Sequence, residues 1–152
     1  MNKNVVIIIA EDDEGHASLI IRNLKRSGIT NKIIWFKDGQ EVLDFLFERG
    51  EGPILQKGKM YLLQLDIRMP KIDGIEVLRQ IKNHKELRKL PVVMVTTTDN
   101  PAEIDKCYKI GCNSYFTKPV DYNKFVTVIK QLGLYWSLVQ FPEINGEKYS
   151  FV

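Results

Sequence analysis

A run of six apolar residues, Val5–Ala10, restricts the fold of this chain more than any other feature. A strand with one solvated face alternates apolar and polar residues, whereas a strand covered on both faces is apolar throughout. The run is also far shorter than the roughly 18 apolar residues that a membrane-spanning helix needs. It is therefore typical of a central strand in a parallel sheet that has helices on both faces.

The pattern of a strand followed by a helix occurs five times along the chain. After Val5–Ala10, apolar residues at helical spacing extend from Ala17 to Leu24, and Gly28 ends this helix. Five such units predict an α/β fold with a doubly wound, five-stranded parallel sheet and helices on both faces. The other four expected strands are Lys32–Phe36, Met60–Leu65, Pro91–Thr96 and Ser114–Thr117.

Three of the helices are expected to begin at side-chain caps. In each case an Asp or Asn that can accept from free backbone N–H groups is followed three residues later by a Glu. The polar, glycine-containing segment Gly50–Lys59 is expected to be an exposed loop. The capping pairs are Asp38 with Glu41, Asp73 with Glu76, and Asn100 with Glu103.

Composition and charge are those of an ordinary soluble domain. Of the 152 residues, 44% are hydrophobic and 27% are charged, which suits one domain with its own core. The net charge of +3 is small and the 22 Lys and Arg residues are spread along the chain, so no nucleic-acid-binding surface is expected.

We expect reduced, buried thiols at Cys107 and Cys112, and exposed helix positions for His16 and His84. The absence of a signal-peptide pattern favours a cytoplasmic protein.

Acidic residues follow two of the expected strands at the point where each strand ends. Glu11, Asp12 and Asp13 come directly after the first strand, and Asp66 comes directly after the third. The carboxyl ends of parallel strands converge on one crevice, and carboxylates gathered there repel one another unless a cation compensates them. Oxygen ligands of this kind suit Mg2+, which also accepts a phosphate oxygen as a ligand. The pattern predicts a site for Mg2+ and a phosphoryl group.

A simpler interpretation exists for some of these residues, because an Asp after a strand is often only a turn former or a helix cap. We favour that interpretation for Asp13 and Asp73. It does not suit Asp66, since Asp73 already supplies the cap of the next helix. Thr96 and Lys118 end the fourth and fifth strands, and they would add a hydroxyl donor and a positive charge to the crevice. Transfer of a phosphoryl group requires both kinds of contact.

Four stretches around these strand ends carry a joint pattern: Ile9–Asp13, Leu65–Gly74, Met94–Thr97 and Tyr115–Pro119. Together they resemble the signatures of bacterial response-regulator receiver domains, the phosphoproteins of two-component and phosphorelay signal transduction. The resemblance extends over about residues 4–132 and implies a flavodoxin-like strand order, 2-1-3-4-5. It also implies that Asp66 accepts a phosphoryl group from the phosphohistidine of a sensor histidine kinase or a phosphotransfer protein.

The resemblance implies roles for the other residues of the crevice. Glu11, Asp12 and Asp66, together with the backbone carbonyl of Arg68, would bind the Mg2+ on which phosphorylation depends. Lys118 would contact the phosphoryl group, and the bond between Lys118 and the following Pro would be cis, as it is in members of this family.

The resemblance further implies a switch between two conformations. Thr96, which also contacts the phosphoryl group, and Tyr115 would form the switch pair. Their movement would repack the face formed by the fourth helix, the fifth strand and the fifth helix. Arg68, Thr97 and Thr98 are expected to tune hydrolysis of the acyl phosphate, with Arg68 and Thr98 at the mouth of the site.

A second resemblance concerns a subfamily. Trp35–Gly39, the long insert before the third strand and the ending Leu134–Pro142 are similar to the small regulators that partner bacterial phytochrome-type sensor kinases. We expect a receiver domain over residues 1–134 and, over residues 135–152, an extension of the last helix with a tail and no separate output domain. The tail contains five aromatic residues, too many for a disordered end. It either folds back on its own domain or supports a homodimer through the last helix.

Two other classes of function are compatible with this fold. A haloacid-dehalogenase-type phosphatase also has a nucleophilic Asp at a strand end, but it usually relies on a second Asp two positions on, where this chain has Arg68. An unphosphorylated protein-interaction module would not need the site residues, all of which are present. We therefore expect a switch that catalyses only its own phosphorylation and dephosphorylation, and not an enzyme.

Overall fold

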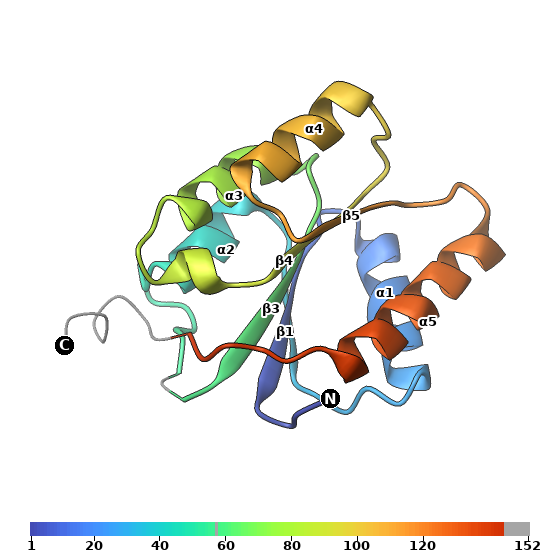
Figure 1. The fold of residues 1–152 in the computed structure, drawn as a ribbon, viewed down its shortest axis with the longest axis horizontal. Helices are drawn as coiled ribbons and strands as arrows, with labels where there is room; N and C mark the ends of the chain where they lie inside the picture. Colours follow the sequence, from blue (N-terminus) through green and yellow to red (C-terminus); the bar gives the residue numbers. More distant parts are fainter. Residues whose placement is uncertain (57, 145–152) are drawn as a thin grey trace.

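The computed structural model describes residues 1–56 and 58–144, and within them it contains one five-stranded sheet (Figure 1). All pairings are parallel and the order is β2-β1-β3-β4-β5, which confirms the expected flavodoxin-like arrangement. The strands are β1 (Val5–Ala10), β2 (Ile33–Phe36), β3 (Met60–Leu65), β4 (Val92–Thr96) and β5 (Ser114–Thr117). The helices are α1 (Glu14–Arg26), α2 (Gly39–Leu46), α3 (Gly74–Lys82), α4 (Pro101–Ile110) and α5 (Tyr122–Leu138).

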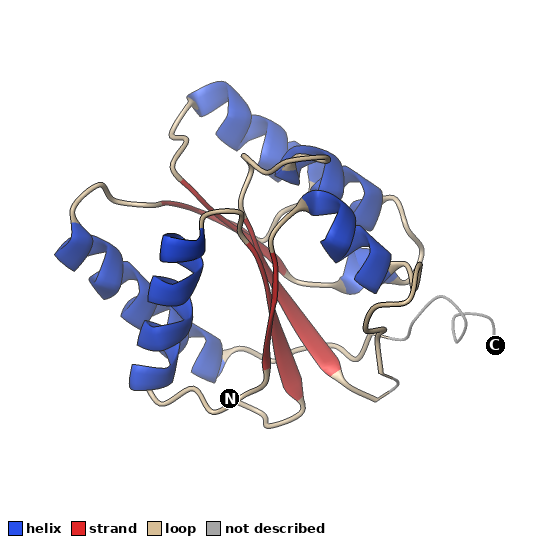
Figure 2. Cartoon of the chain, turned by 180° about the vertical axis from the view of Figure 1, so that it is seen from behind, coloured by secondary structure: helices blue, strands red, loops and turns tan. Residues whose placement is uncertain are grey.

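The helices form a layer on each face of the sheet (Figures 1 and 2). α1 and α5 pack together on one face, whereas α2, α3 and α4 cover the other. Successive residues of β1 point to opposite faces, so Ile7 and Ile9 lie in the core on the α1 and α5 side while Ile8 and Ala10 lie in the other core. Every residue of β1 is buried, as the uninterrupted apolar run predicts.

The helix caps agree with the expected pattern at α2, where Glu41 also accepts from the N–H of Lys37, but only in part at α3 and α4. Asp38 and Asp73 each accept a hydrogen bond from the backbone N–H three residues on, at 2.8 and 2.9 Å. At α4, Asn100 Oδ1 accepts from the N–H of Ala102, and the carboxylate of Glu103 binds side chains of two neighbouring loops. The role expected for the Glu is therefore wrong at both helices, because Glu76 binds side chains of its own helix and Glu103 binds side chains outside its helix.

The segment before β3 is a loop, as expected, but it is not exposed throughout. Leu55 is buried in the core, and the backbone N–H of Gln56 donates to the hydroxyl of Tyr61 at 2.8 Å. Lys57 lies outside the described residues. The expectation of full exposure is wrong at Leu55, because an apolar side chain beside the core is more stable out of water.

The chain after α5 folds back across the starts of the strands (Figure 1). α5 continues to Leu138, and Trp136 near its end is buried in the core on the α1 side. Glu143 then forms an antiparallel bridge with Met60 at the start of β3, and Ile144 is fully buried in the core on the α2 side. Residues 139–144 thus connect the two helical layers. The tail residues Tyr149 and Phe151 lie outside the described residues.

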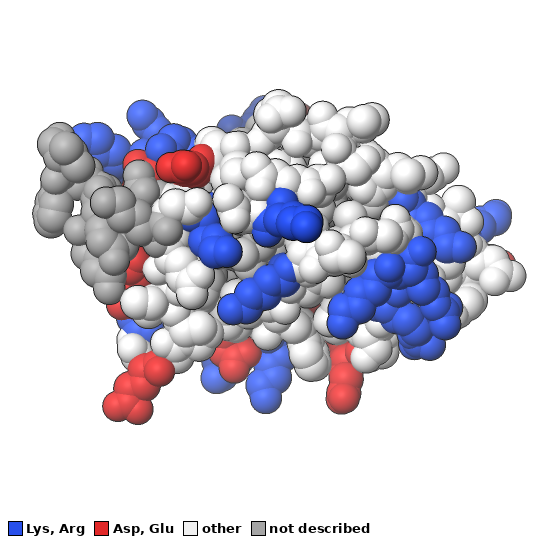
Figure 3. Space-filling view, turned by 90° about the horizontal axis from the view of Figure 1, so that it is seen from below, with Lys and Arg blue, Asp and Glu red and all other residues white. Residues whose placement is uncertain are grey.

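Charges of both signs are distributed over the face formed by the strand starts and the tail. Figure 3 shows Lys and Arg side chains in several places separated by uncharged surface, with the largest group at one end and Asp and Glu mainly at the rim. No described helix is long and apolar enough to cross a membrane. Both cysteines are free and buried, as expected, and burial raises the pKa of the Cys107 thiol to about 11.

Gly74, the first residue of α3, lies where only a glycine fits. A Cβ atom there would lie 2.0 Å from the backbone oxygen of Asp66, and the N–H of Gly74 donates to the carbonyl of Ile67 at 2.8 Å. We predict that Gly74→Ala lowers the free energy of unfolding by at least about 2 kcal/mol, because backbone must move to admit the methyl group. Urea denaturation measures this.

Gly52→Ala is the matched control for this substitution. No atom lies within 4 Å of the position that its Cβ would occupy, so its effect should stay within about 0.5 kcal/mol. Equal free energies of unfolding for the two variants would contradict the close approach of α3 to the loop that carries Asp66.

Candidate functional site

The acidic residues at the ends of β1 and β3 meet in one pocket. Glu11 and Asp66 are buried and Asp12 is exposed, and one oxygen from each of them lies within 4.8 Å of the other two. The register of the sheet causes this approach, since Ala10 pairs with Leu65 and the N–H of Asp66 donates to the carbonyl of Ala10 at 3.0 Å. Three carboxylate oxygens at this spacing can bind a divalent cation.

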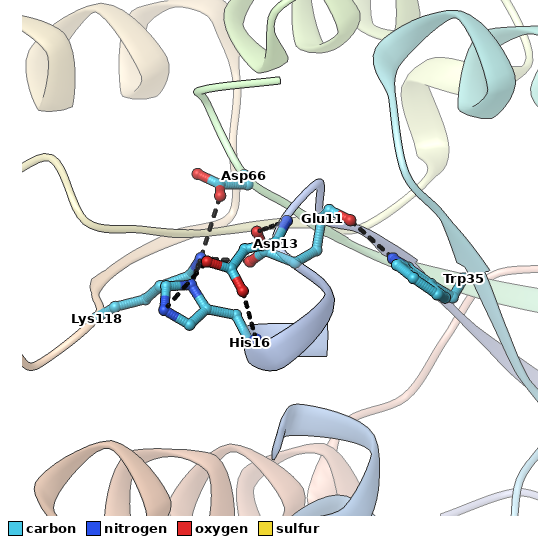
Figure 4. A network of polar contacts seen from close by, with 6 residues as sticks. All are labelled: Glu11, Asp13, His16, Trp35, Asp66 and Lys118. Atoms are coloured by element: carbon cyan, nitrogen blue, oxygen red, sulfur yellow. Dashed lines mark hydrogen bonds and ion pairs between the residues drawn. The ribbon is translucent and has the colours of Figure 1, made fainter. Parts of the chain in front are cut away.

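The ammonium group of Lys118 lies among these carboxylates (Figure 4). Its Nζ donates to Glu11 Oε1 and, at 3.1 Å, to Asp66 Oδ2, and it lies 3.1 Å from His16 Nδ1. Both ion pairs are almost completely buried. An ammonium has three N–H donors, so the three contacts use all of them. Lys118 thereby ties the end of β5 to the ends of β1 and β3.

The pocket carries more negative than positive charge, because two buried carboxylates share one ammonium. Burial, reinforced by the negative charge of Asp66, raises the pKa of Glu11 to about 8, although Lys118 acts in the opposite direction. Ionisation of Glu11 is therefore less favourable in this pocket than in water, and another positive charge would favour it. A divalent cation bound by Glu11, Asp12 and Asp66 would supply that charge.

Two buried oxygen atoms of the strand ends have no hydrogen-bond partner among the described residues: Asp66 Oδ1 and Thr96 Oγ1. A buried polar group left unpaired costs about 1–3 kcal/mol, so such atoms often mark the place of a ligand, an ion or water. The carboxylate oxygen of Asp66 could bind a cation or a phosphoryl group, and the hydroxyl of Thr96 could donate to a phosphoryl oxygen. These atoms and the three carboxylates are therefore compatible with a site for a divalent cation, while Mg2+ and the phosphoryl group stay predictions.

The residues expected to tune the site occupy two different places. Arg68 and Thr97 line the pocket, which has a volume of about 180 Å³. Thr98 does not line it, so the expected place of Thr98 at the mouth of the pocket is wrong. Its hydroxyl donates to Glu103 Oε2 and its carbonyl accepts from the hydroxyl of Tyr115, each at 2.7 Å.

Tyr115 is anchored to the loop between β4 and α4 by that hydrogen bond. Its ring is partly buried against the core on the α2 side, and burial raises the pKa of Tyr115 to about 12. The hydroxyl therefore stays protonated and remains a donor. Thr96 and Tyr115 lie on the adjacent strands β4 and β5, where Tyr115 pairs with Met94 and Thr96 pairs with Thr117.

His16 is a pocket residue that sequence reasoning missed. Its ring contacts Lys118 and packs edge-on against Phe125 of α5, with 5.7 Å between the ring centroids. It was expected to be exposed, but the first turn of a helix that follows a strand end faces the crevice. The position of His16 in the first turn after β1 could therefore have predicted its place in the pocket. Asp13, as expected, caps α1 by accepting from the N–H of His16 at 3.0 Å.

Two further expectations are wrong in their local detail. His84 lies outside the helices, where its Nδ1 accepts from the N–H groups of Glu86 and Leu87 and its ring packs against Phe47. The Lys118–Pro119 bond is trans, since no described peptide bond is cis. The two forms of a bond before proline differ by only about 0.5–1 kcal/mol, so the residue pair alone does not decide between them.

Comparisons with known proteins agree with this geometry. Residues 7–130 match the family model described as the response regulator receiver domain. A receiver domain from Rhodospirillum rubrum is 43% identical, with a TM-score of 0.86 over 93% of this chain and 99% of that one. The phosphorylated cyanobacterial phytochrome response regulator RcpA is 28% identical, with a TM-score of 0.80 over 90% of this chain and 97% of RcpA.

Response regulator Rcp1 from Synechocystis is a further relative. It is 31% identical over 135 residues, which cover 89% of this chain and 90% of Rcp1. Its Mn2+-bound structure has a TM-score of 0.82 over 90% of this chain and 98% of that one.

The raised pKa of Glu11 predicts how pH affects stability and cation binding. A carboxyl group whose folded pKa exceeds its unfolded value of 4.5 contributes stability that is present below 4.5 and is lost as pH rises through about 8. A divalent cation should compensate the charge that forms. We predict that a fixed concentration of Mg2+ raises the melting temperature more at about pH 9 than at about pH 6.

Thermal unfolding with and without Mg2+ measures this difference. Glu11→Gln is the control, because a neutral amide cannot titrate, and its Mg2+ effect should vary much less with pH. An equal Mg2+ effect on the wild-type protein at both pH values would refute the charge deficit inferred for the pocket.

Proposed function

Because the chain belongs to the response regulator receiver domain family, we propose that Asp66 accepts a phosphoryl group from the phosphohistidine of a sensor histidine kinase or a phosphotransfer protein. The family places the chain in two-component signal transduction. The observation that carries the assignment is the buried carboxylate of Asp66, which has one oxygen held by Lys118 and the other without a partner.

In the proposed reaction, a carboxylate oxygen of Asp66 attacks the phosphorus in line with the bond between phosphorus and the donor imidazole. The new bond from oxygen to phosphorus forms as the bond to nitrogen breaks, and its electron pair returns to the imidazole. The product is an acyl phosphate. Water later attacks the phosphorus, which releases inorganic phosphate and restores the carboxylate.

The neighbouring residues hold the charge that this transfer spreads over the phosphoryl oxygens. Glu11, Asp12 and Asp66, with the backbone carbonyl of Arg68, would bind Mg2+, which neutralises that charge when bound. The Mn2+-bound structure of Rcp1 supports a divalent-cation site in this family. Lys118 would turn one N–H from a carboxylate toward a phosphoryl oxygen.

The same arrangement supports a switch role for Thr96 and Tyr115. Thr96 Oγ1 has no partner among the described residues, so a phosphoryl oxygen on Asp66 would give it one. Its movement toward that oxygen would change the space beside Tyr115 on the adjacent strand. The expected consequence is a repacked α4-β5-α5 face, as a shift between two existing conformations.

The pocket favours a switch over an enzyme that turns over small phosphate esters. A phosphatase of the haloacid-dehalogenase type needs a general acid two residues after its nucleophile, and here that residue is the permanently charged Arg68. Arg68, Thr97 and Thr98 would instead set the lifetime of the acyl phosphate. Receiver domains are signalling modules, and we infer that this one catalyses only its own phosphorylation and dephosphorylation.

We also propose an organisation and partners for the chain. The receiver domain, placed over residues 1–134, would be extended by residues 135–152, in a cytoplasmic protein. The similarity to the phytochrome response regulator RcpA supports a phytochrome-type kinase as the phosphoryl donor. Leu134 and Leu138 expose apolar side chains near the end of α5, which supports a homodimer through this helix.

Phosphorylation of Asp66 can be tested by intact-mass measurement after incubation with acetyl phosphate and Mg2+. We expect the mass of one phosphoryl group on the wild-type protein and none on Asp66→Asn, because an amide cannot act as the acceptor. Asp105→Asn, a change of an exposed Asp on α4, is the control and should be phosphorylated like the wild type. A wild-type protein without an adduct, despite bound Mg2+, would disprove the proposal.

The homodimer can be tested by sedimentation velocity. We expect the wild-type protein to be a dimer and Leu134→Glu/Leu138→Glu to be a monomer, because two charges on an apolar interface remain desolvated and unpaired. Lys85→Glu changes the charge at an exposed position outside α5 and should leave the dimer intact. A monomeric wild-type protein, before and after phosphorylation, would exclude this dimer.

A further inference from the structure

Glu103, in the first turn of α4, connects residues from three other parts of the fold. Its Oε1 accepts from Arg68 Nη2 at 3.0 Å, and its Oε2 accepts from the hydroxyl of Thr98 at 2.7 Å. The carbonyl of Thr98 in turn accepts from the hydroxyl of Tyr115 at 2.7 Å. A continuous series of contacts therefore leads from Arg68, at the mouth of the pocket, to Tyr115 of the expected switch pair.

Within the Arg68–Glu103 pair, Arg68 is the partner that is free to leave. The Glu103 side chain is 23% exposed, and it is held by Thr98 and favoured by the positive end of the α4 dipole. The Arg68 side chain is 68% exposed, and among the described residues it forms an ion pair with Glu103. A competing anion would therefore move Arg68 and leave Glu103 in place.

A phosphoryl group on Asp66 would be such an anion. It carries between one and two negative charges near neutral pH and three acceptor oxygens, and a guanidinium binds such oxygens through two parallel N–H groups. Arg68 and Asp66 line the same pocket. An exposed ion pair contributes only about 0.2–1 kcal/mol, so exchange of Glu103 for a phosphoryl oxygen has a small cost.

We propose that Glu103 is a positioning residue that holds Arg68 away from Asp66 until the phosphoryl group arrives. Arg68 then moves to the phosphoryl oxygens, and Glu103 keeps only Thr98. The loop that anchors Tyr115 thereby loses its connection to the loop after β3. This inference rests on the proposed phosphorylation of Asp66, and it explains how a change at the pocket reaches α4.

The proposal predicts that loss of the Arg68–Glu103 ion pair raises the affinity of the site for a phosphoryl group. The ion pair exists only in the unphosphorylated state, so its removal should favour the state with a phosphoryl group on Asp66. Glu103→Gln removes the charge and retains an oxygen that can accept from Thr98. A contribution of about 0.2–1 kcal/mol corresponds to a gain in affinity of about 1.4- to 5-fold.

The test is titration of the metal-loaded protein with beryllofluoride, which mimics a phosphoryl group on a carboxylate. We expect Glu103→Gln to bind it more tightly than the wild type by this factor. In an Arg68→Met background, Glu103→Gln should have no effect, because the partner of the ion pair is already absent. A merely structural role for Glu103 would not depend on Arg68 in this way.

Glu76→Gln is the matched control. Glu76 forms another partly exposed ion pair, with Arg79 on α3, and neither residue lines the pocket, so the affinity of Glu76→Gln should equal that of the wild type. Unchanged affinity in Glu103→Gln, or a gain that persists without Arg68, would overturn the role of Glu103 while leaving Asp66 as the acceptor. No beryllofluoride binding to the wild type would instead contradict the proposed function, and the role of Glu103 with it.

Discussion

The geometry of the site depends on one buried ammonium, that of Lys118, held between the buried carboxylates of Glu11 and Asp66. A buried charge without a partner costs several kcal/mol, so these three groups stabilise the pocket only together. Because they follow β5, β1 and β3, their pairing also holds three strand ends in register. The pairing is incomplete, since one positive charge faces two negative charges, and the raised pKa of Glu11 expresses that imbalance. A pocket arranged in this way is most stable when a further cation enters it.

Two buried polar atoms at the same ends of the strands lack hydrogen-bond partners among the described residues. In the cores, apolar side chains from both helical layers pack against the strands, whereas Asp66 Oδ1 and Thr96 Oγ1 at the strand ends have no partner among the described residues. Unsatisfied polar atoms persist where function requires them, at a cost that the rest of the fold offsets. The two atoms lie at the ends of the neighbouring strands β3 and β4, and the proposed phosphoryl group on Asp66 would give Thr96 a partner that it now lacks.

Much of the fold and of the site could be predicted because both depend on short, local patterns. The apolar run Val5–Ala10 identified the central strand, and acidic residues directly after β1 and β3 identified the pocket, since parallel strands bring their carboxyl ends to one edge. His16 and Glu103 could not be assigned in this way. His16 was expected to be exposed and Glu103 to cap its own helix, because sequence spacing describes neighbours along the chain and not side chains that arrive from other loops.

By itself, the sequence determined the order of the strands and helices, the buried character of β1 and the identity of the acidic, hydroxyl and basic groups at the strand ends. These are consequences of side-chain periodicity and of residue type. Only the tertiary structure decided which of these groups touch: that Lys118 binds Glu11, Asp66 and His16 at once, that Thr98 faces Glu103, and that Ile144 closes the opposite end of the sheet. The reason is that packing fixes distances and burial, and these set both the charge balance of the pocket and the contacts through which it can act.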